Sequence, residues 1–431
     1  MASATAIYTA CQWLTIVFLS RFTSAELLGS YALALAVVTP VLTLTGLALR
    51  YVLCTDARKE FPFSSYLFVR LTTILLSLAA IGLWAFEQPS AIFLVVVVLG
   101  IAKGSDALCD IIHGLLQAHG RMDRIAISLI LQGTLQLTLF STVTLLTGSL
   151  VCGIAASALV SMSICWGFDR KSVRLVRRSD EPGLAEELGA FCHLSPSHWV
   201  QVRKLIWLGL PLGLVMGMNS LIGNIPRYFL AYGHGQAAVG IFAALYYLTL
   251  PGGIVVAAYC DSACPQLAKW GSDSDFRPFC KVLVLLVTAA AILGLGGWVI
   301  AYSAGRPILL LCYGPQYALE APSLAWLMAG AGFLYISTVL GYAVTSLREF
   351  HLQVPFRAVH LFVVYLVCLY LIPKEGLLGA AKSIFVSSVM FAVAMAALFL
   401  VILRKKILLS REAFPTPEPY PAEIVLTKAD S

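Results

Sequence analysis

Apolar residues run through the chain in long blocks, separated by short breaks rich in charged or turn-forming residues. About twelve blocks reach roughly twenty residues, the length of an α-helix that crosses a lipid bilayer. They lie near residues 4–20, 27–49, 65–86, 91–117, 125–147, 149–168, 205–230, 237–260, 280–303, 322–345, 356–373 and 376–403. This pattern predicts an all-α polytopic membrane protein with about twelve transmembrane helices.

The second and eighth blocks carry the same pattern of residues at a constant separation. The segment LLGSYALALAVVTPV corresponds to AVGIFAALYYLTLPG, and each matched pair is 211 positions apart. The pairs are Gly29 and Gly240, Tyr31 and Phe242, Ala32 and Ala243, and Pro40 and Pro251. We interpret this as a duplication that gives two six-helix lobes. An even number of spans inserts both copies the same way up, so the lobes form a parallel repeat around a central cavity.

One long polar connection separates the two halves. We expect residues 1–168 to form the N-terminal lobe, residues 169–204 a basic cytoplasmic linker, residues 205–404 the C-terminal lobe and residues 405–431 a cytoplasmic tail. Basic residues gather in alternate loops, so the positive-inside rule places both termini in the cytoplasm. This distribution accounts for the net charge of +7 without a nucleic-acid partner.

Composition narrows the class of protein further. Charged residues make up 12% of the chain, against roughly a quarter in a soluble protein. The eleven cysteines lie mostly inside apolar blocks, without spacing suited to zinc, so we expect small buried side chains and no metal or cofactor. No Walker A motif is present, which excludes a built-in ATPase of that type.

Ionisable residues interrupt the apolar run of residues 91–119. Lys103, Asp106, Asp110 and His113 follow at spacings of three, four and three, which places them on one stripe of a helix. Such a stripe is costly in a membrane unless it faces a water-filled cavity or a partner helix. We expect these four residues to face a cavity and to serve the function of the protein. The alternative is a structural ion pair between Lys103 and Asp106.

Three further bases fall within or near the apolar blocks, namely Arg50, Arg227 and Lys382. With Lys103 they predict a mostly cationic path and therefore an anionic cargo, for which arginine is well suited because it binds phosphate oxygens in pairs. The alternative for Arg50, Arg227 and Lys382 is that their long side chains reach the lipid headgroups.

Two features could serve the transport cycle itself. Asp106, Asp110 and His113 are candidates for proton coupling, because a carboxylate in a low-dielectric cavity or a histidine near neutral pH can exchange protons. Pro40 and Pro251 predict equivalent helix kinks in the two lobes. Prolines without a role in motion are the equally weighted alternative.

The sequence resembles Wzx-type polysaccharide flippases of the multidrug/oligosaccharidyl-lipid/polysaccharide exporter superfamily. The longest similar stretch is LSRFTSAELLGSYALALAVVTPVLTLTGLALRYVLCTDARKEFPFSSYLFVR. Three shorter ones are HGLLQAHGRMDRIAIS, PLGLVMGMNSLIGNIPRYFLAYGHGQAAVGIFAALYYLTLPG and YGPQYALEAPSLAWL. These are loose patterns of Gly, Pro, Arg and aromatic residues that extend over nearly the whole chain.

The resemblance implies a transporter, not an enzyme. It would flip a polyprenyl-pyrophosphate-linked oligosaccharide across the bacterial inner membrane by alternating access, for O-antigen or exopolysaccharide synthesis. The implied partners are this lipid-linked sugar, membrane lipids, and a polysaccharide polymerase with its chain-length machinery. The matching cavity residues are Arg50, Lys103, Asp106, Arg227 and Lys382. Tyr31, Tyr246 and Tyr247 are candidates to stack on sugar rings, with packing between helices as the equally weighted alternative.

Three other functions stay open at this point. A multidrug or small-cation antiporter of the same superfamily would share the fold but should carry more acidic than basic buried residues. A major-facilitator carrier would have a basic loop motif after its second span, where this chain reads CTDARKEFP. A membrane-embedded polymerase or glycosyltransferase would need a sizeable outer loop or paired catalytic acids, and the outer loops here are short.

Overall fold

The computed structural model describes residues 2–56, 60–176, 196–273, 276–347, 349 and 352–413, and every element among them is helical. The elements of the first half are α1 (Ala2–Phe22), α2 (Ala25–Thr45), α3 (Leu49–Thr55), α4 (Phe63–Phe86), α5 (Ser90–Ala118), α6 (Met122–Thr147), α7 (Leu150–Ile164), the π-helix η1 (Cys165–Asp169) and α8 (Arg170–Val176). Those of the second half are α10 (Pro196–Tyr247), α11 (Leu250–Ser272), α12 (Phe276–Cys312), α13 (Pro315–Ala318), α14 (Ala321–Ser346) and α15 (Gln353–Ala413).

Ten helical stretches within the described residues are long and apolar enough to cross a membrane. Two of them, Trp199–Ser272 and Gln353–Leu408, are 74 and 56 residues long, where one crossing needs about twenty. Each contains a glycine in the left-handed region, Gly235 with φ 81° and Gly376 with φ 57°, a conformation that ends a helix. Each stretch therefore holds two spans, and the predicted all-α fold with about twelve spans is confirmed.

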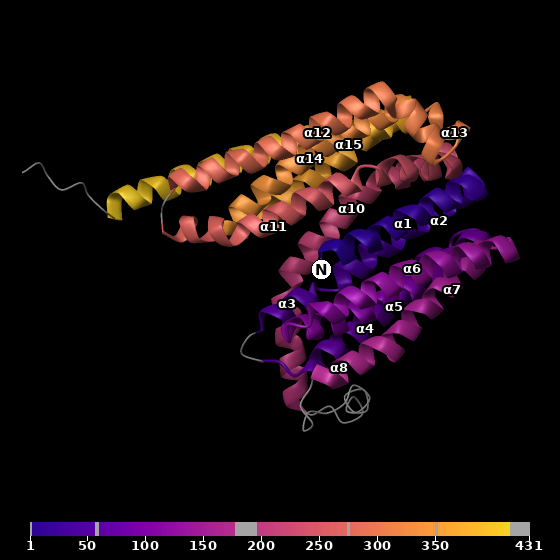
Figure 1. Cartoon of the computed structure of the whole chain (residues 1–431), viewed down its shortest axis with the longest axis horizontal. Helices are drawn as coiled ribbons and strands as arrows, with labels where there is room; N and C mark the ends of the chain where they lie inside the picture. Colours follow the sequence, from indigo (N-terminus) through magenta and orange to yellow (C-terminus); the bar gives the residue numbers. More distant parts are fainter. Residues whose placement is uncertain are drawn as a thin grey trace, which may run out of the picture.

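The spans form two lobes (Figure 1). Helices α1 to α8 make the first lobe, and α11, α12, α14 and α15 lie in the second, with α10 running between them. The first part of α10 packs on the first lobe, where Trp199 meets the ring of Phe68 at 5.6 Å and Val202 and Leu205 join the buried cluster around Leu67. Residues 177–195 of the predicted linker and 414–431 of the predicted tail lie outside the described residues.

The lobes meet where α2 crosses the second part of α10, and this crossing has the symmetry of the sequence repeat. A Cβ atom on Gly29 would overlap the carbonyl oxygen of Gln236, and a Cβ atom on Gly240 would overlap that of Ala25. Ala25 and Gln236 are themselves 211 positions apart, as are Gly29 and Gly240. The contact thus maps onto itself when the two lobes are exchanged, as at a two-fold interface. Glycine is required there because the two backbones touch.

A second set of contacts joins the lobes at the end that carries α13. The Trp13 indole N–H donates to the Tyr313 hydroxyl at 2.9 Å. Arg21, at the end of α1, donates to the carbonyl oxygens of Leu310, Leu311 and Cys312 at the end of α12. Figure 1 shows the lobes converging at this end and diverging toward the C-terminal end of α15. The lobes are thus in contact at the end that carries α13 and lie further apart at the other end.

We predict that Gly29→Leu and Gly240→Leu each lower the unfolding temperature of the purified protein in detergent. The added side chain would force two backbones apart, and overpacking of this kind costs about 1–3 kcal/mol. Gly82→Leu is the matched control, because a Cβ atom at Gly82 meets nothing within 4 Å. An unfolding temperature of Gly29→Leu equal to that of Gly82→Leu would contradict the described crossing.

Candidate functional site

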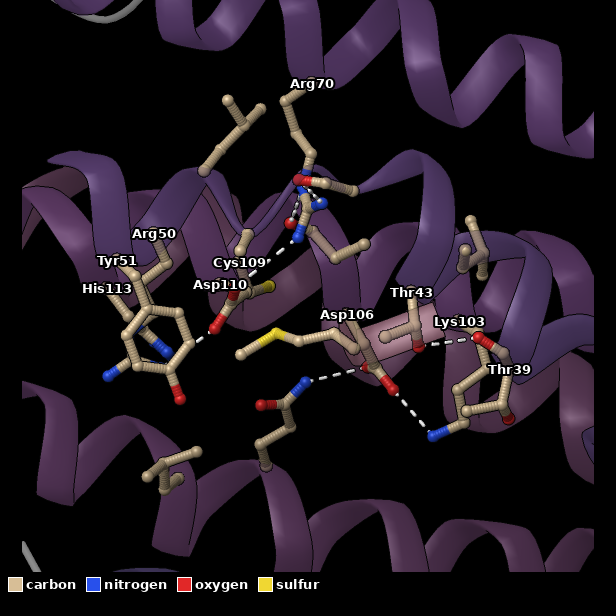
Figure 2. A pocket seen from close by; sticks show the side chains of 18 of the residues that line it. Thr39, Thr43, Arg50, Tyr51, Arg70, Lys103, Asp106, Cys109, Asp110 and His113 are labelled. Atoms are coloured by element: carbon tan, nitrogen blue, oxygen red, sulfur yellow. Dashed lines mark hydrogen bonds and ion pairs between the residues drawn. The ribbon is translucent and has the colours of Figure 1, made fainter. Parts of the chain in front are cut away.

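Two adjoining polar pockets lie along α5. Figure 2 shows residues that line the larger one. The two pockets have volumes of about 460 and 230 Å³, and Thr39, Lys103 and Asp106 line both. The larger pocket also contains Asp110 and His113, so all four residues of the predicted stripe reach it. A helical stripe of ionisable residues thus faces a cavity, as its cost in a membrane requires.

The Asp106 carboxylate lies between the two pockets and accepts four hydrogen-bond contacts. Lys103 Nζ lies 2.9 Å from Oδ2, one turn earlier on α5. Oδ1 accepts from Ser161 at 2.6 Å, Gln132 at 2.9 Å and Gln136 at 3.1 Å. These donors come from α6 and α7, so the carboxylate ties three helices together and keeps its negative charge matched by Lys103.

A second ionic cluster lies near the end of α5. Asp110 pairs with Arg50 at 2.8 Å and with Arg70 at 3.4 Å. Arg50 also donates from Nε and Nη2 to the side-chain oxygen of Gln117, at 3.2 and 2.9 Å. One carboxylate thus holds two guanidinium groups, and its own side chain is 39% exposed to the pocket. The cluster carries a net positive charge that a soluble anion can reach.

The turn between α2 and α3 positions Arg50. Leu47 and Ala48 adopt φ values of 51° and 49°, in the left-handed region that costs a residue with a side chain roughly 1–2 kcal/mol. The turn ends α2 at Thr45 and starts α3 at Leu49, so that Arg50 reaches Asp110. The Gly46 carbonyl in this turn accepts from Arg70 at 3.4 Å, which joins the turn to the ionic cluster.

Arg70 was not among the residues predicted from the sequence. It lies in α4, is only 8% exposed, and donates to the Ala107 carbonyl of α5 at 2.8 Å. Its signal was a lone base inside the apolar block of residues 65–86. An isolated base near the end of a block has the same appearance whether it faces lipid or a cavity, so its partner could not be named.

His113 lines the larger pocket, although its side chain is almost completely buried. Its Nε2 atom lies 3.0 Å from the hydroxyl of Ser128 and 3.2 Å from a carboxylate oxygen of Asp169. Asp169 is fully buried and ends the π-helical turn η1, a local widening of the helix that is frequent at functional sites. His113 therefore links the pocket to the π-helical turn η1 that follows α7.

Arg227 and Lys382 are not among the residues that line the two polar pockets. Arg227 is 7% exposed, donates to Asn224 at 2.6 Å and lies 5.5 Å from the ring centre of Tyr246. Lys382 pairs with Glu375 at 2.6 Å. Of the three predicted tyrosines, Tyr31 and Tyr247 line the smaller pocket, whereas Tyr246 contacts Arg227.

The two predicted kink positions differ in the structure. Helix α2 continues through Pro40 to Thr45. Before Pro251, however, α10 ends at Tyr247, and α11 begins at Leu250 with the proline in its first turn. The role of either proline in motion stays a prediction.

The charged lining of the two pockets comes from the first lobe alone. Among the residues that line them, only Met216 and Tyr247, both in α10, belong to the second half of the chain. The two lobes therefore differ in the polar residues that they contribute to the pockets, although they keep the same arrangement of helices.

No family model matches the chain. It is 21% identical over 380 residues to the capsular polysaccharide biosynthesis protein CapF of Staphylococcus aureus, an alignment that covers 88% of this chain and 92% of CapF. Its structure matches the lipid II flippase MurJ in an inward closed conformation, with a TM-score of 0.69 at 11% identity over 97% of this chain and 93% of MurJ.

A similar match is a multidrug resistance transporter of the MATE family of the MOP superfamily in an inward-facing conformation. Its TM-score is 0.67 at 14% identity, over 94% of this chain and 96% of that transporter. The chain shares the fold of these two transporters. The predicted architecture of two lobes related by a repeat is confirmed, and the similarity to CapF agrees with the resemblance described from the sequence.

We predict that Asp106→Ala strongly destabilises the protein in detergent. The change leaves Lys103 and three polar donors without their acceptor, and breaking such a pair by removal of one partner costs about 3–5 kcal/mol. We expect the low end, because the Asp106 side chain is 17% exposed. Asp123→Ala is the control, since Asp123 pairs with Arg121 at 3.0 Å in an exposed position where a pair contributes about 0–1 kcal/mol. Equal unfolding temperatures of the two variants would refute the role of Asp106 as a link between helices.

Proposed function

We propose that this protein is a flippase that moves a polyprenyl-pyrophosphate-linked oligosaccharide from the cytoplasmic to the outer leaflet for surface polysaccharide biosynthesis. The observation that carries the proposal is the cluster in which Arg50 and Arg70 share the carboxylate of Asp110 beside a pocket of about 460 Å³. Similarity to a capsular polysaccharide biosynthesis protein and to a lipid II flippase supports the same cargo class.

The cluster is chemically suited to hold a pyrophosphate and release it again. Arg50 and Asp110 are 24% and 39% exposed, so an incoming phosphate can replace the carboxylate on the guanidinium. Two guanidinium groups offer paired hydrogen bonds that match phosphate oxygens. The neighbouring Asp110 then competes with the substrate, which keeps the affinity low enough for release.

The smaller pocket suits the sugar part of the cargo. Tyr31 and Tyr247 provide aromatic surfaces there, while Gln12, Gln136 and Ser157 supply polar groups for hydroxyls. Since Lys103 and Asp106 line both pockets, the pyrophosphate and the first sugars would lie on either side of this pair.

The orientation follows from charge. The positive-inside rule places the end with the C-terminal turn of α15 and its residues Arg404, Lys405 and Lys406 in the cytoplasm. The end closed by Trp13, Tyr313 and Arg21 then faces outward, and the pockets are reached from the cytoplasmic side. In a bacterium this corresponds to the inner membrane, where a polysaccharide polymerase and its chain-length machinery would receive the flipped product.

A multidrug antiporter is the second candidate, because the MATE transporters share the fold. A cationic drug would need an unpaired carboxylate in the cavity. Here Asp106 and Asp110 are each paired with a base at 2.9 and 2.8 Å. This pairing favours an anionic cargo and a transporter over a membrane-embedded polymerase, which would need accessible catalytic acids.

We predict that cells lacking the protein accumulate lipid-linked glycan on the inner leaflet, and that Arg50→Ala and Lys103→Ala fail to restore surface glycan at normal membrane levels. Lys374→Ala is the control, because Lys374 is exposed and lies against Tyr370, away from both pockets. The measurement is surface glycan per cell together with lipid-linked intermediate. Surface glycan that persists in the deletion strain would reject the proposed cargo.

Proton coupling would act through the same cluster. Asp110 is the proton-coupling candidate that contacts both Arg50 and Arg70, the groups proposed to bind the phosphate. Asp106 contacts Lys103 and three polar donors of the first lobe instead. His113 is hydrogen-bonded to Ser128 and Asp169 and lines the same pocket as Asp110.

We predict that Asp110→Asn raises the affinity of the purified protein for farnesyl pyrophosphate, because a neutral amide competes less strongly than a carboxylate with the phosphate for Arg50 and Arg70. Titration calorimetry gives the comparison with the wild type, and Asp123→Asn, an exposed change outside both pockets, is the control. An affinity of Asp110→Asn equal to or below that of the wild type would rule out this competition without affecting the proposed cargo.

A further inference from the structure

A third groove lies on α15, away from both polar pockets. It has a volume of about 230 Å³ and is lined by Pro355, Phe356, Val359, Val363, Met390 and Ala394, together with His360 and Phe391. Helix α15 packs against α14 and α10, whereas Val359 and Met390 are 62% and 50% exposed. Exposed apolar side chains on a transmembrane span face lipid tails, so this groove opens toward the bilayer.

Two polar side chains adjoin this apolar groove without a polar partner among the described residues. His360 is 3% exposed, stacks on Phe391 at 4.2 Å between ring centres, and has no hydrogen bond at either ring nitrogen. The Arg357 guanidinium lies 4.4 Å from the centre of the same ring, and no ion pair or hydrogen bond joins it to the described part of the chain. A buried polar group without a partner is costly, and an unpaired charge at the membrane more so.

The position of Arg357 corresponds to the level of the lipid headgroups. It is the fifth residue of α15, which places it about 6 Å along the helix from its first residue. The ion pair between Lys406 and Glu349, at 3.5 Å, marks the same end of the lobe. From Arg357 the groove continues toward Val363, deeper in the span. A cation at headgroup depth thus lies at the start of an apolar channel.

We propose that this groove binds one anionic diacyl phospholipid of the adjacent leaflet, with its phosphate on Arg357 and an acyl chain along the groove. An anionic lipid fits better than a zwitterionic one, because the unpaired guanidinium supplies the positive charge that a choline group would duplicate. The site is separate from the flippase pockets and does not depend on the identity of the cargo.

The test is native mass spectrometry of the purified full-length protein titrated with dioleoyl phosphatidylglycerol or dioleoyl phosphatidylcholine. We expect one phosphatidylglycerol to be retained about fivefold more strongly than phosphatidylcholine, the factor typical of one Arg near a headgroup. Arg357→Gln should abolish the difference, and Arg357→Lys should keep part of it. Ala394→Phe, which fills the groove but leaves Arg357 in place, should also abolish it.

Arg404→Gln is the matched control, because it removes one exposed positive charge from the same end of the second lobe, outside the groove. Retention by this variant should equal that of the wild type. Equal retention of the two lipids by the wild type would overturn the proposal. So would a phosphatidylglycerol preference that survives both Arg357→Gln and Ala394→Phe, because Arg357 would then only reach bulk headgroups.

Discussion

The structure of the first lobe depends on the high cost of an unpaired charge inside a membrane. Helix α5 carries four ionisable residues through an apolar environment, and each has a partner on a neighbouring helix or on α5 itself. Because Asp106 binds groups from α6 and α7, and Asp110 binds groups from α3 and α4, the lobe is assembled around this one helix. The residues that give the pocket its chemistry therefore also set the positions of the surrounding helices. A substitution at these sites that changes the pocket lining therefore also removes contacts between helices.

Duplication explains the frame of the molecule, and divergence explains its chemistry. The crossing of Gly29 and Gly240 keeps the two-fold relation at the level of backbone contact. The polar residues that line the pockets are not restricted in this way, because a side chain that faces a cavity can be substituted without moving the backbones at the crossing. The first lobe supplies the charged lining with Lys103, Asp106 and Asp110, and α10 contributes Met216 and Tyr247 to the pocket walls.

The sequence predicted the spans, the repeat and the ionisable stripe because each is a periodic or local feature. Apolar blocks need only a length criterion, and the stripe needs only the helical period. Partners across helices could not be predicted, since the pairing of Asp110 with Arg70, or of His113 with Asp169, joins residues 40 and 56 positions apart. Arg227 and Lys382 show the same limit. Their depth could be estimated, but whether they face a pocket depends on the rotation of a helix that no local pattern sets.

The contact between Arg21 and the end of α12 has an energetic consequence. The carbonyls of Leu310, Leu311 and Cys312 are terminal acceptors of a helix, and Arg21 is itself exposed. Water can replace Arg21 on these carbonyls with little loss, since a hydrogen bond exchanged with solvent contributes only about 0.5–1.5 kcal/mol. The glycine crossing offers no such exchange, because no polar group is released there. Both sets of contacts lie at the same end of the lobes, because α1 ends at Phe22 and α2 begins at Ala25. They differ in kind, since water can replace the hydrogen bonds of Arg21 but nothing replaces the direct backbone contact of the glycine crossing.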